Sequence, residues 1–400
     1  MRDLGQVVDR TNAVYDARYS GALLTDLMFV GDAIADDAVV SLAETAYDAD
    51  GGQLGRLREL DAKGDPAAQA FFEAVNTTPD WLEPKLLRCG QRVALAYVDF
   101  YGLSLMHSLF AGGLFSRATL VTNSTGRLGS HPARRIQETG AFIGSILEPR
   151  GLEPGSLGFE TAVRVRLLHG SIRAWLGRSP GFSEAYVGVP LDQTMLAMTL
   201  SLFDYLNLRS MTRMGVRLTE DELRGHHHLW RYIGHLLGID ERLLTTNLED
   251  ERALWGSLVL HQTFPELCGE PYVRSVVSTV AGLMGLSGRR KAFLRTLYFH
   301  LSGPAWFGAE PRKTRDPLRS IVGDPLLPLL RGAGALVGAA HTIVPGAADR
   351  MVARGARQLA AASEMARSHG FGVSVEEDEE GALAFEALAS GVRARFADVA

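Results

Sequence analysis

A histidine on a predicted helix is the residue best placed in this sequence to do chemistry. The segment 159–176 carries an apolar stripe, and His169 lies at the edge of that stripe. The stripe consists of Val165, Leu168, Ile172 and Leu176. A histidine directed toward a core either hydrogen-bonds through both ring nitrogens or uses one of them as a metal ligand. The pattern alone favours a satisfied core residue, and a metal ligand is the alternative.

The predicted helix before it carries a cation, a hydroxyl and a carboxyl in close succession. Arg135 and Thr139 are four residues apart and share one helix face, which Phe142 and Ile146 continue. Glu138 lies three residues after Arg135 and is adjacent to it on the helix surface. These side chains could line a pocket, or Arg135 and Glu138 could form an ordinary surface ion pair. The spacing favours neither.

A second group of histidines could bind a metal ion. His226, His227, His228 and His235 fall on a predicted helix over 220–237. Consecutive helical residues point in different directions, so these histidines cannot all ligate one ion. We expect at most one of His226 and His227 to face inward. A metal site on this helix is therefore less favoured than ordinary surface or core histidines.

The composition is that of a globular protein without a nucleic-acid partner. The chain has 400 residues, of which 46% are hydrophobic, so its core can enclose a sealed pocket. Its formal net charge is −5 and it has no block of Lys and Arg, whereas phosphate binding needs a concentrated basic surface. The two cysteines, Cys89 and Cys268, cannot form a disulfide framework or a Cys-x-x-Cys zinc cage, which favours a reducing compartment.

The amino-terminal residues have no apolar segment of the kind found in export signals, so we expect a cytoplasmic protein. The stretch 332–348 lacks Asp, Glu, Lys and Arg, but it contains His341 and Pro345. It is also shorter than the ~20 strongly apolar residues that cross a bilayer. We expect a buried or peripheral helix there and no integral membrane span, while weak association with a membrane surface stays open.

Apolar residues recur at three- and four-residue spacing through most of the chain, and sustained period-two alternation is almost absent. This pattern predicts an all-α protein: one large helical bundle domain with extra helices over 1–370, followed by an acidic loop and carboxy-terminal tail over 371–400. Thr219 and Glu222 have the spacing of a capping box at a helix start, and Gly238 marks its end. The predicted helices span 34–45, 66–75, 83–110, 132–147, 159–176, 192–215, 220–237, 250–264, 272–284, 289–301, 325–343 and 347–369.

Five short motifs occur in the order found in one known family. They are GDAIAD at 31–36, TGRL at 125–128 with RRIQET at 134–139, RVRLLH at 164–169, GVPLDQ at 188–193 and WRYIGHLLGI at 230–239. Together they resemble elements of the latex clearing proteins and fungal MpaB-type oxygenases, which share the rubber oxygenase catalytic domain. The resemblance is strongest over 31–240, about half of the chain, and five motifs in order make it specific.

The resemblance implies an all-helical bundle whose globin-like core helices surround a pocket for haem b. The family's proximal iron ligand corresponds to His169, 34 positions after Arg135. Arg135 and Thr139 correspond to the arginine and threonine beside the haem. Arg166 and Arg173, three residues before and four residues after His169, could pair with the haem propionates or face solvent.

The implied activity is that of a haem-dependent oxygenase. It would use O2 to cleave or oxidise a C=C bond in an apolar small molecule, such as an isoprenoid, a lipid or a polyketide-like compound. We expect three catalytic residues: Arg135 stabilises charge on oxygen or anchors a propionate, Thr139 donates a hydrogen bond, and Glu138 moves a proton. The alternatives are a haem peroxidase or hydroxylase of a biosynthetic pathway, a non-catalytic protein that binds haem or an apolar ligand, and a non-haem metal enzyme.

Three features depart from the rubber-cleaving members of the family. Those proteins are exported, so we do not expect an extracellular polymer as the substrate of this chain. Their distal lysine corresponds to Glu138 here, which could act as a base or could pair with Arg135. The glutamate proposed as catalytic in that family has Thr119 at its equivalent offset.

Overall fold

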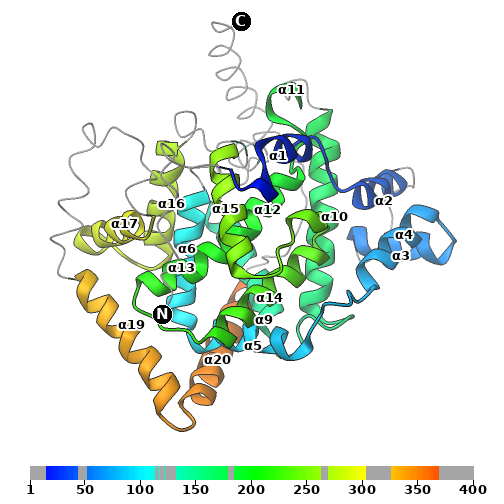
Figure 1. The fold of residues 1–400 in the computed structure, drawn as a ribbon. Helices are drawn as coiled ribbons and strands as arrows, with labels where there is room; N and C mark the ends of the chain where they lie inside the picture. The colour runs from blue at the N-terminus through cyan, green and yellow to red at the C-terminus, as the bar shows by residue number, and fades with distance from the viewer. Residues whose placement is uncertain are drawn as a thin grey trace, which may run out of the picture.

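The computed structural model describes residues 15–43, 52–112, 117, 121, 132–178, 184–262, 269–302 and 326–368. These residues form helices and connecting loops, without a β-strand, so the all-α prediction is confirmed (Figure 1). In chain order the elements are η1 (Ala17–Tyr19), α1 (Gly21–Leu27), α2 (Ala33–Ala43), α3 (Gly52–Ala62), α4 (Pro66–Asn76), α5 (Pro84–Ala96), α6 (Val98–Gly112), α9 (Pro132–Leu147), α10 (Leu157–Gly177), α11 (Glu184–Val187), α12 (Gln193–Phe203), α13 (Tyr205–Arg213), α14 (Glu220–Leu236), η2 (Glu241–Leu243), α15 (Leu248–Gln262), α16 (Gly269–Leu283), α17 (Gly288–Ser302), α19 (Leu326–Ile343) and α20 (Ala347–Ser368).

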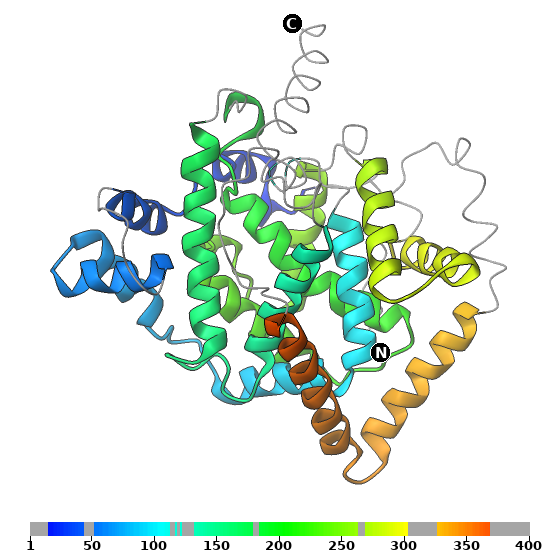
Figure 2. The ribbon, with the colours of Figure 1, turned by 180° about the vertical axis from the view of Figure 1, so that it is seen from behind.

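One contiguous hydrophobic core runs through the middle of the molecule. Its largest fully buried side chains include Trp230, Tyr97, Tyr298, Phe71 and Phe110. Helices α5, α6, α9, α10 and α12 to α15 surround this core, while α2, α3 and α4 project on one side of α10 (Figure 1). Helices α16, α17 and α19 lie on the opposite side, and α19 and α20 form a hairpin at one edge (Figure 2). The predicted acidic tail over 371–400 lies outside the described residues.

Two predicted helices are broken in the structure. The predicted helix over 83–110 is α5 followed by α6, which meet at an angle of 93° around Tyr97. The predicted helix over 192–215 is α12 followed by α13, separated by Asp204 with φ −89° and ψ −87°. Both breaks lie in strongly apolar sequence, where helical periodicity continues on each side of the bend and does not reveal it.

The predicted helix signals around α14 are confirmed. The side chain of Thr219 accepts a hydrogen bond from the N–H of Glu222, and the Glu222 carboxylate accepts one from the N–H of Thr219. Gly238 follows the helix with φ +74°, a conformation that glycine adopts without steric cost. The capped start and the glycine stop therefore fix the length of the helix that carries the histidine cluster.

Among the described helices, α19 has the length and apolar composition to cross a membrane. Helices α5 and α6 pass the same test only as a pair, and the 93° bend separates them. Only 17% of the apolar window of α19 is buried inside the protein.

Candidate functional site

Helix α10 presents the predicted iron ligand. It begins after Ser156, whose hydroxyl accepts a hydrogen bond from the N–H of Phe159, and it packs against α9 and α2. Leu167 packs in the main core and Leu176 in a separate small cluster with Val121 and Met195, and neither leucine has exposed surface. His169 is half-buried on this helix, and its Nδ1 atom is buried. The structure thus places the imidazole partly inside the protein on a helix held from two sides.

Helix α9 carries the other predicted catalytic residues. Glu138 is buried, with 7% of its surface exposed, whereas Thr139 is exposed. Of the predicted stripe, Ile146 is fully buried and Phe142 half-buried. Gly140 is also exposed, and a Cβ added to it would meet no atom within 4 Å, so this turn of α9 lies at the surface. The side chain of Arg135 lies outside the described residues, as does Thr119.

Arg166 and Arg173 turn toward α2. The guanidinium of Arg166 donates from Nε and Nη2 to the carboxylate of Asp32, at 2.6 and 3.0 Å, and both side chains are buried. The Nε atom of Arg173 donates to Asp36 at 2.7 Å. Burial raises the pKa of Asp36, and the charge of Arg173 opposes that rise. These pairs hold α2 against α10, and contact of either arginine with haem propionates stays a prediction.

Gln193 and Gly238 lie beside the ion pair between Asp32 and Arg166. The side-chain amide of Gln193 donates to the carbonyls of Gly31 and Gly238, at 2.8 and 3.1 Å, and its oxygen accepts from the N–H of Asp240 at 2.8 Å. A Cβ on Gly238 would overlap the Asp32 carboxylate and the Arg166 guanidinium. We call Gly31, Asp32, Arg166, Gln193 and Gly238 the motif junction. They come from four of the five sequence motifs and join α2, α10, α12 and α14.

The expectation that at most one of His226 and His227 faces inward is wrong. His226, His227 and His228 are 0%, 4% and 7% exposed, respectively. Helix α14 packs against α5, α10, α12 and α15, so most of its circumference is covered. His226 and His227 both direct Nδ1 to the carboxylate of Asp204, at 3.1 and 2.6 Å. His228 instead accepts from the N–H of Glu83 at 2.9 Å and covers the start of α5.

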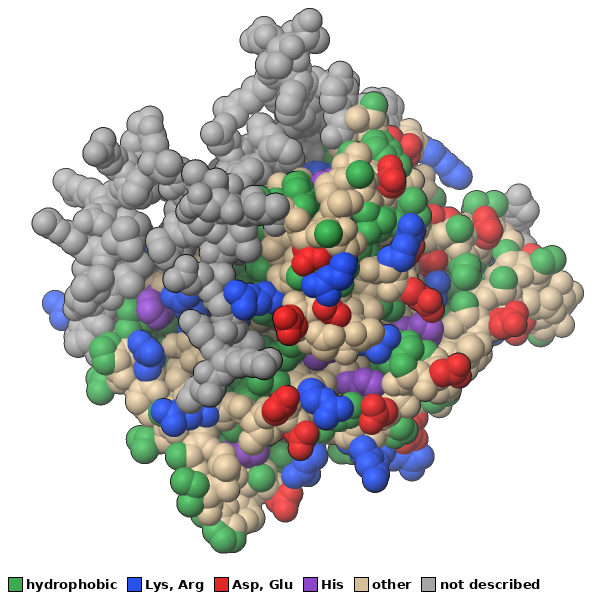
Figure 3. Space-filling model, viewed as in Figure 1, with side chains coloured by type: hydrophobic (Ala, Val, Ile, Leu, Met, Phe, Trp, Pro, Cys, Tyr) green, Lys and Arg blue, Asp and Glu red, His purple; other side chains and the backbone are tan. Residues whose placement is uncertain are grey.

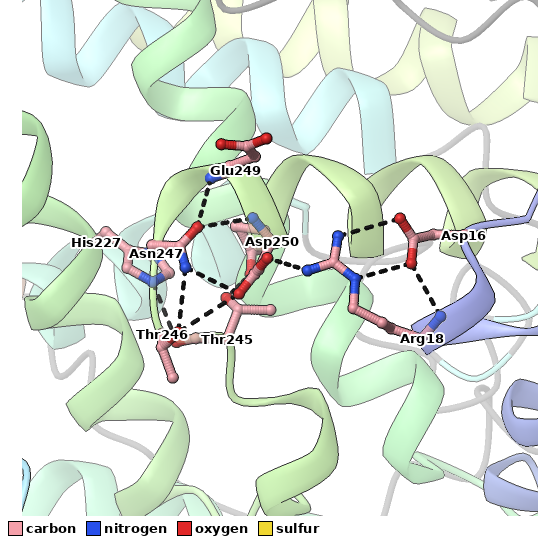
Figure 4. Close-up of polar contacts among 9 residues, drawn as sticks. Asp16, Arg18, His227, Thr245, Thr246, Asn247, Glu249 and Asp250 are labelled. Atoms are coloured by element: carbon pink, nitrogen blue, oxygen red, sulfur yellow. Dashed lines mark hydrogen bonds and ion pairs between the residues drawn. The ribbon is translucent and has the colours of Figure 1, made fainter.

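Hydrogen bonding assigns the proton positions in this cluster. The Nε2 atom of His226 accepts from the indole N–H of Trp230 at 3.3 Å, so its Nδ1 carries the proton that is donated to Asp204. The Nε2 atom of His227 donates to the carbonyl of Thr245 at 3.1 Å (Figure 4). Burial opposes ionisation of Asp204, but the charge of His227 and the hydrogen bonds from His226 and His227 lower its pKa to about 2. Burial likewise opposes the charge on His227, and Asp204 still raises its pKa.

Glu251 on α15 completes the cluster. Its carboxylate accepts from the hydroxyls of Ser201 and Thr245, each at 2.5 Å, and it is 3% exposed. Burial, assisted by the charge of Asp204, raises the pKa of Glu251 to about 7.

Hydrogen bonds and an ion pair hold the loop before α15 in place (Figure 4). Asn247 accepts from the N–H groups of Glu249 and Asp250, each at 3.0 Å, and thereby caps the helix. Arg18 forms an ion pair with Asp250. These contacts fix the position of Thr245, whose carbonyl and hydroxyl both belong to the histidine cluster.

Ligand atoms of Asp204, His227 and Glu251 lie within 4.8 Å of one another, a spacing that a metal ion could bridge. In this structure, however, the imidazole and both carboxylates already hydrogen-bond to each other or to neighbouring groups. The hydrogen-bonding groups of the cluster therefore all have partners within the protein. We therefore assign it to the support of α13, α14 and α15.

A pocket of about 250 Å³ lies between α3, α4 and the first turns of α10. Its lining residues are Leu54, Arg58, Asp61, Phe72, Val75, Asn76, Gly155, Phe159, Glu160 and Val163. It is smaller than the ~300–1,000 Å³ typical of ligand pockets and contains none of the predicted site residues. We do not assign the reaction to it.

Comparison with known proteins agrees with this architecture. The solved structure of latex clearing protein in the closed state matches with a TM-score of 0.57 and 20% identity, covering 83% of this chain and 90% of that chain. At this identity the match shows the fold alone. Rubber oxygenase from Streptomyces sp. (strain K30) is 26% identical over 200 residues, 48% of this chain and 46% of that protein. The aligned part thus spans less than half of that curated relative.

A family model matches residues 89–362, well over half of the chain. The match defines the class of the protein, an all-α oxygenase catalytic domain. The chain belongs to the family described as ER-bound oxygenase mpaB/B′/Rubber oxygenase, catalytic domain. Helices α9 and α10 lie within the matched residues, whereas the motif at 31–36 precedes them.

Proposed function

We propose that this chain is a haem b-dependent oxygenase that uses O2 to cleave or oxidise a C=C bond in an apolar small molecule. The observation that carries the proposal is the family match over 89–362, which includes all six predicted site residues on α9 and α10. The curated relative is a rubber oxygenase, and its name supports the same reaction class. The preference for a small molecule and a cytoplasmic location remain predictions.

Two observations on α10 support a haem site. His169 is half-buried on α10 and offers an imidazole, the usual proximal ligand. The Nη2 atom of Arg173 is buried and has no hydrogen-bond partner among the described residues, so it could donate to a propionate. When bound, the haem would supply the affinity for O2 and the redox chemistry.

The protein's own side chains would orient the reactants and move protons. Arg135 and Thr139 would donate hydrogen bonds beside the haem, and Glu138 would hold or transfer a proton from a buried position. Each of these side chains has the donor, acceptor or acid group that its proposed role requires. The apolar core side chains around α10 would exclude water from the site.

Product analysis under labelled O2 tests the proposal. The purified protein is incubated with a panel of unsaturated isoprenoids and lipids under ¹⁸O2, and products are analysed by mass spectrometry. We expect label in carbonyl or hydroxyl products. A haem protein that binds carbon monoxide but neither consumes O2 nor labels any product would identify a ligand-binding protein instead. Turnover with peroxide alone would identify a peroxidase.

A further inference from the structure

The start of α17 is a basic surface. Four basic side chains fall within its first eight residues, namely Arg289, Arg290, Lys291 and Arg295. The three arginines are exposed, and Lys291 is half-buried, with its Nζ atom donating to the hydroxyl of Ser278 at 3.0 Å. We call these four basic residues the α17 basic cluster. Figure 3 shows basic side chains over α17 at the left of the molecule.

Among the described residues, no carboxylate balances this cluster. Residues 271–302 contain no Asp or Glu. Helices α6, α13 and α16 pack against α17. Neither α13 nor the following helix α19 has an acidic residue, and Asp99 of α6 pairs with Arg354 instead. Glu270 lies at the opposite end of α16, about 20 Å from the α16–α17 turn.

The place of the cluster in the helix adds to the excess of positive charge. The amino-terminal end of a helix is the positive end of its macrodipole, and the first turn of α17 has three cations and no acidic residue. The other end of the helix is basic as well, since burial and the charges of Arg213 and Arg331 lower the pKa of His300 to about 4. A negatively charged group at the start of α17 would therefore be stabilised by both the cations and the helix.

The same chain carries a complementary segment. Glu376, Glu377, Asp378, Glu379 and Glu380 follow one another without interruption, and we call them the acidic run. The run comes after residue 362, where the match to the family model ends, whereas α17 lies inside the match. Five consecutive carboxyl groups oppose four cations, so the two segments are complementary in sign and similar in charge.

The acidic run begins within reach of the basic cluster. Glu376 follows Ser368, the last residue of α20, by eight residues, which span up to about 27 Å when extended. Helix α20 packs against α9, and α9 packs against α16. Figure 2 shows α20 ending beside α9, between α10 and α16. Packed helices lie about 8–10 Å apart, which puts α16 roughly 20 Å from α20 across α9. The start of α17 follows α16 directly.

We propose that the acidic run at 376–380 docks on the α17 basic cluster of the same chain. Its carboxylates would pair with the guanidinium groups and with Nζ of Lys291, at the positive end of the helix. A connection this short gives a local concentration of about millimolar, which favours the run over a separate anionic partner. The contact would hold α20 against α9, the helix that carries Glu138 and Thr139. This inference does not require the haem or the proposed reaction.

Carbodiimide cross-linking of the full chain tests this contact, because the reagent joins a lysine amine directly to a carboxylate. The chain has four lysines, Lys63, Lys85, Lys291 and Lys313. We expect mass spectrometry to find Lys291 joined to the acidic run, while Lys63 and Lys85 are not. High salt should lower the yield by screening the exposed charges. Arg289→Gln with Arg290→Gln should lower it about threefold to tenfold, because two of the paired cations are removed.

A matched variant removes two cations elsewhere. The side chains of Arg150 and Arg224 are 79% and 60% exposed in surface pairs, so Arg150→Gln with Arg224→Gln should leave the yield unchanged. Circular dichroism confirms that each variant folds. In a mixture of ¹⁵N-labelled and unlabelled protein, a contact within one chain gives cross-linked peptides of a single isotope.

Three results would overturn the proposal. Peptides of mixed isotope would assign the contact to a second copy of the chain. A Lys291 that an amine-reactive acetylating reagent modifies, but that carbodiimide does not join to the acidic run, would show that the run does not dock there. A link from Lys291 to Glu310, Asp316 or Asp324 would identify a different carboxylate as the partner of the cluster.

Discussion

Asp32 and Arg166 are charged side chains that the fold buries together. Their exposed fractions are 6% and 5%, and two hydrogen bonds join them. A buried charge that loses its partner keeps its desolvation cost and gains nothing in return. The residues of the motif junction therefore stabilise the fold. They hold four helices together, which explains why these motifs are typical of the family.

Asp32→Ala should lower the free energy of unfolding by about 3–5 kcal/mol, because it leaves the Arg166 guanidinium buried without its partner. Urea unfolding followed by circular dichroism measures the change. The control is Glu153→Ala, which removes the partner of Arg150 in an exposed pair and should leave the midpoint unchanged. Equal midpoints for the two variants would show that the junction does not hold the fold.

Glu251 should make stability depend on pH with a definite sign. Its pKa is about 7 in the folded protein, above the ordinary glutamate value, so the folded state binds more protons than the unfolded state between about pH 4.5 and 7. The stability contributed by this group is present below pH 4.5 and is lost as the pH rises toward 7. Glu251→Gln removes that loss.

The stability of Glu251→Gln relative to the wild type should therefore increase from pH 5 to pH 8, by roughly 1–3 kcal/mol. Urea unfolding at four pH values between these limits measures the trend. Glu249→Gln, an exposed neighbour on the same helix, is the control and should show no trend. A relative stability of Glu251→Gln that is flat or decreases with pH would contradict the assigned cluster.

At the scale of helices, the sequence predicts those whose polar and apolar faces are distinct. The bounds of α9 agree with the prediction at both ends, and α14 begins and ends at its predicted caps. The bends at Tyr97 and Asp204 are not predictable from periodicity, because the helical spacing of apolar residues continues on both sides of each bend. Asp204 in particular leaves helical geometry where its carboxylate meets two histidines from α14. The predicted set also lacks α1, α3 and α11, which are short or weakly apolar.

The close crossing of α5 and α14 depends on two glycines. A Cβ on Gly90 would overlap the carbonyl oxygen of Gly225, and a Cβ on Gly225 would overlap Cys89. Gly90→Ala should therefore lower the free energy of unfolding by about 1–3 kcal/mol through overpacking.

Gly102→Ala in α6 is the matched control for this crossing. A Cβ there meets no atom within 4 Å, so the higher helix propensity of alanine should stabilise the protein by roughly 0.5–1 kcal/mol. Thermal unfolding of both variants distinguishes the two effects. A Gly90→Ala variant as stable as the wild type would mean that α5 and α14 pack less closely than described.

At the scale of the whole molecule, the sequence predicts the family and the all-α class, while the structure shows which motif residues act in folding. Arg166 and Arg173, predicted beside the haem, pair with Asp32 and Asp36. The spacing along α10 could not reveal this, because those carboxylates precede the arginines by more than 130 residues. The sequence likewise does not show that Glu138 is buried and Thr139 exposed, because both residues lie on the same predicted helix. Both follow from how α9 packs against its neighbours.

The most direct measurement is the absorption spectrum of the purified protein after loading with haem, compared with that of His169→Ala. We expect an intense Soret band in the wild type, a pyridine haemochrome of b type, and loss or displacement of the band in His169→Ala. The control His341→Ala removes a histidine on α19 that faces Glu222, and it should retain the wild-type spectrum. An identical Soret band in wild type and His169→Ala, or a wild type that takes up no haem, would show that His169 is not the axial ligand of a bound haem.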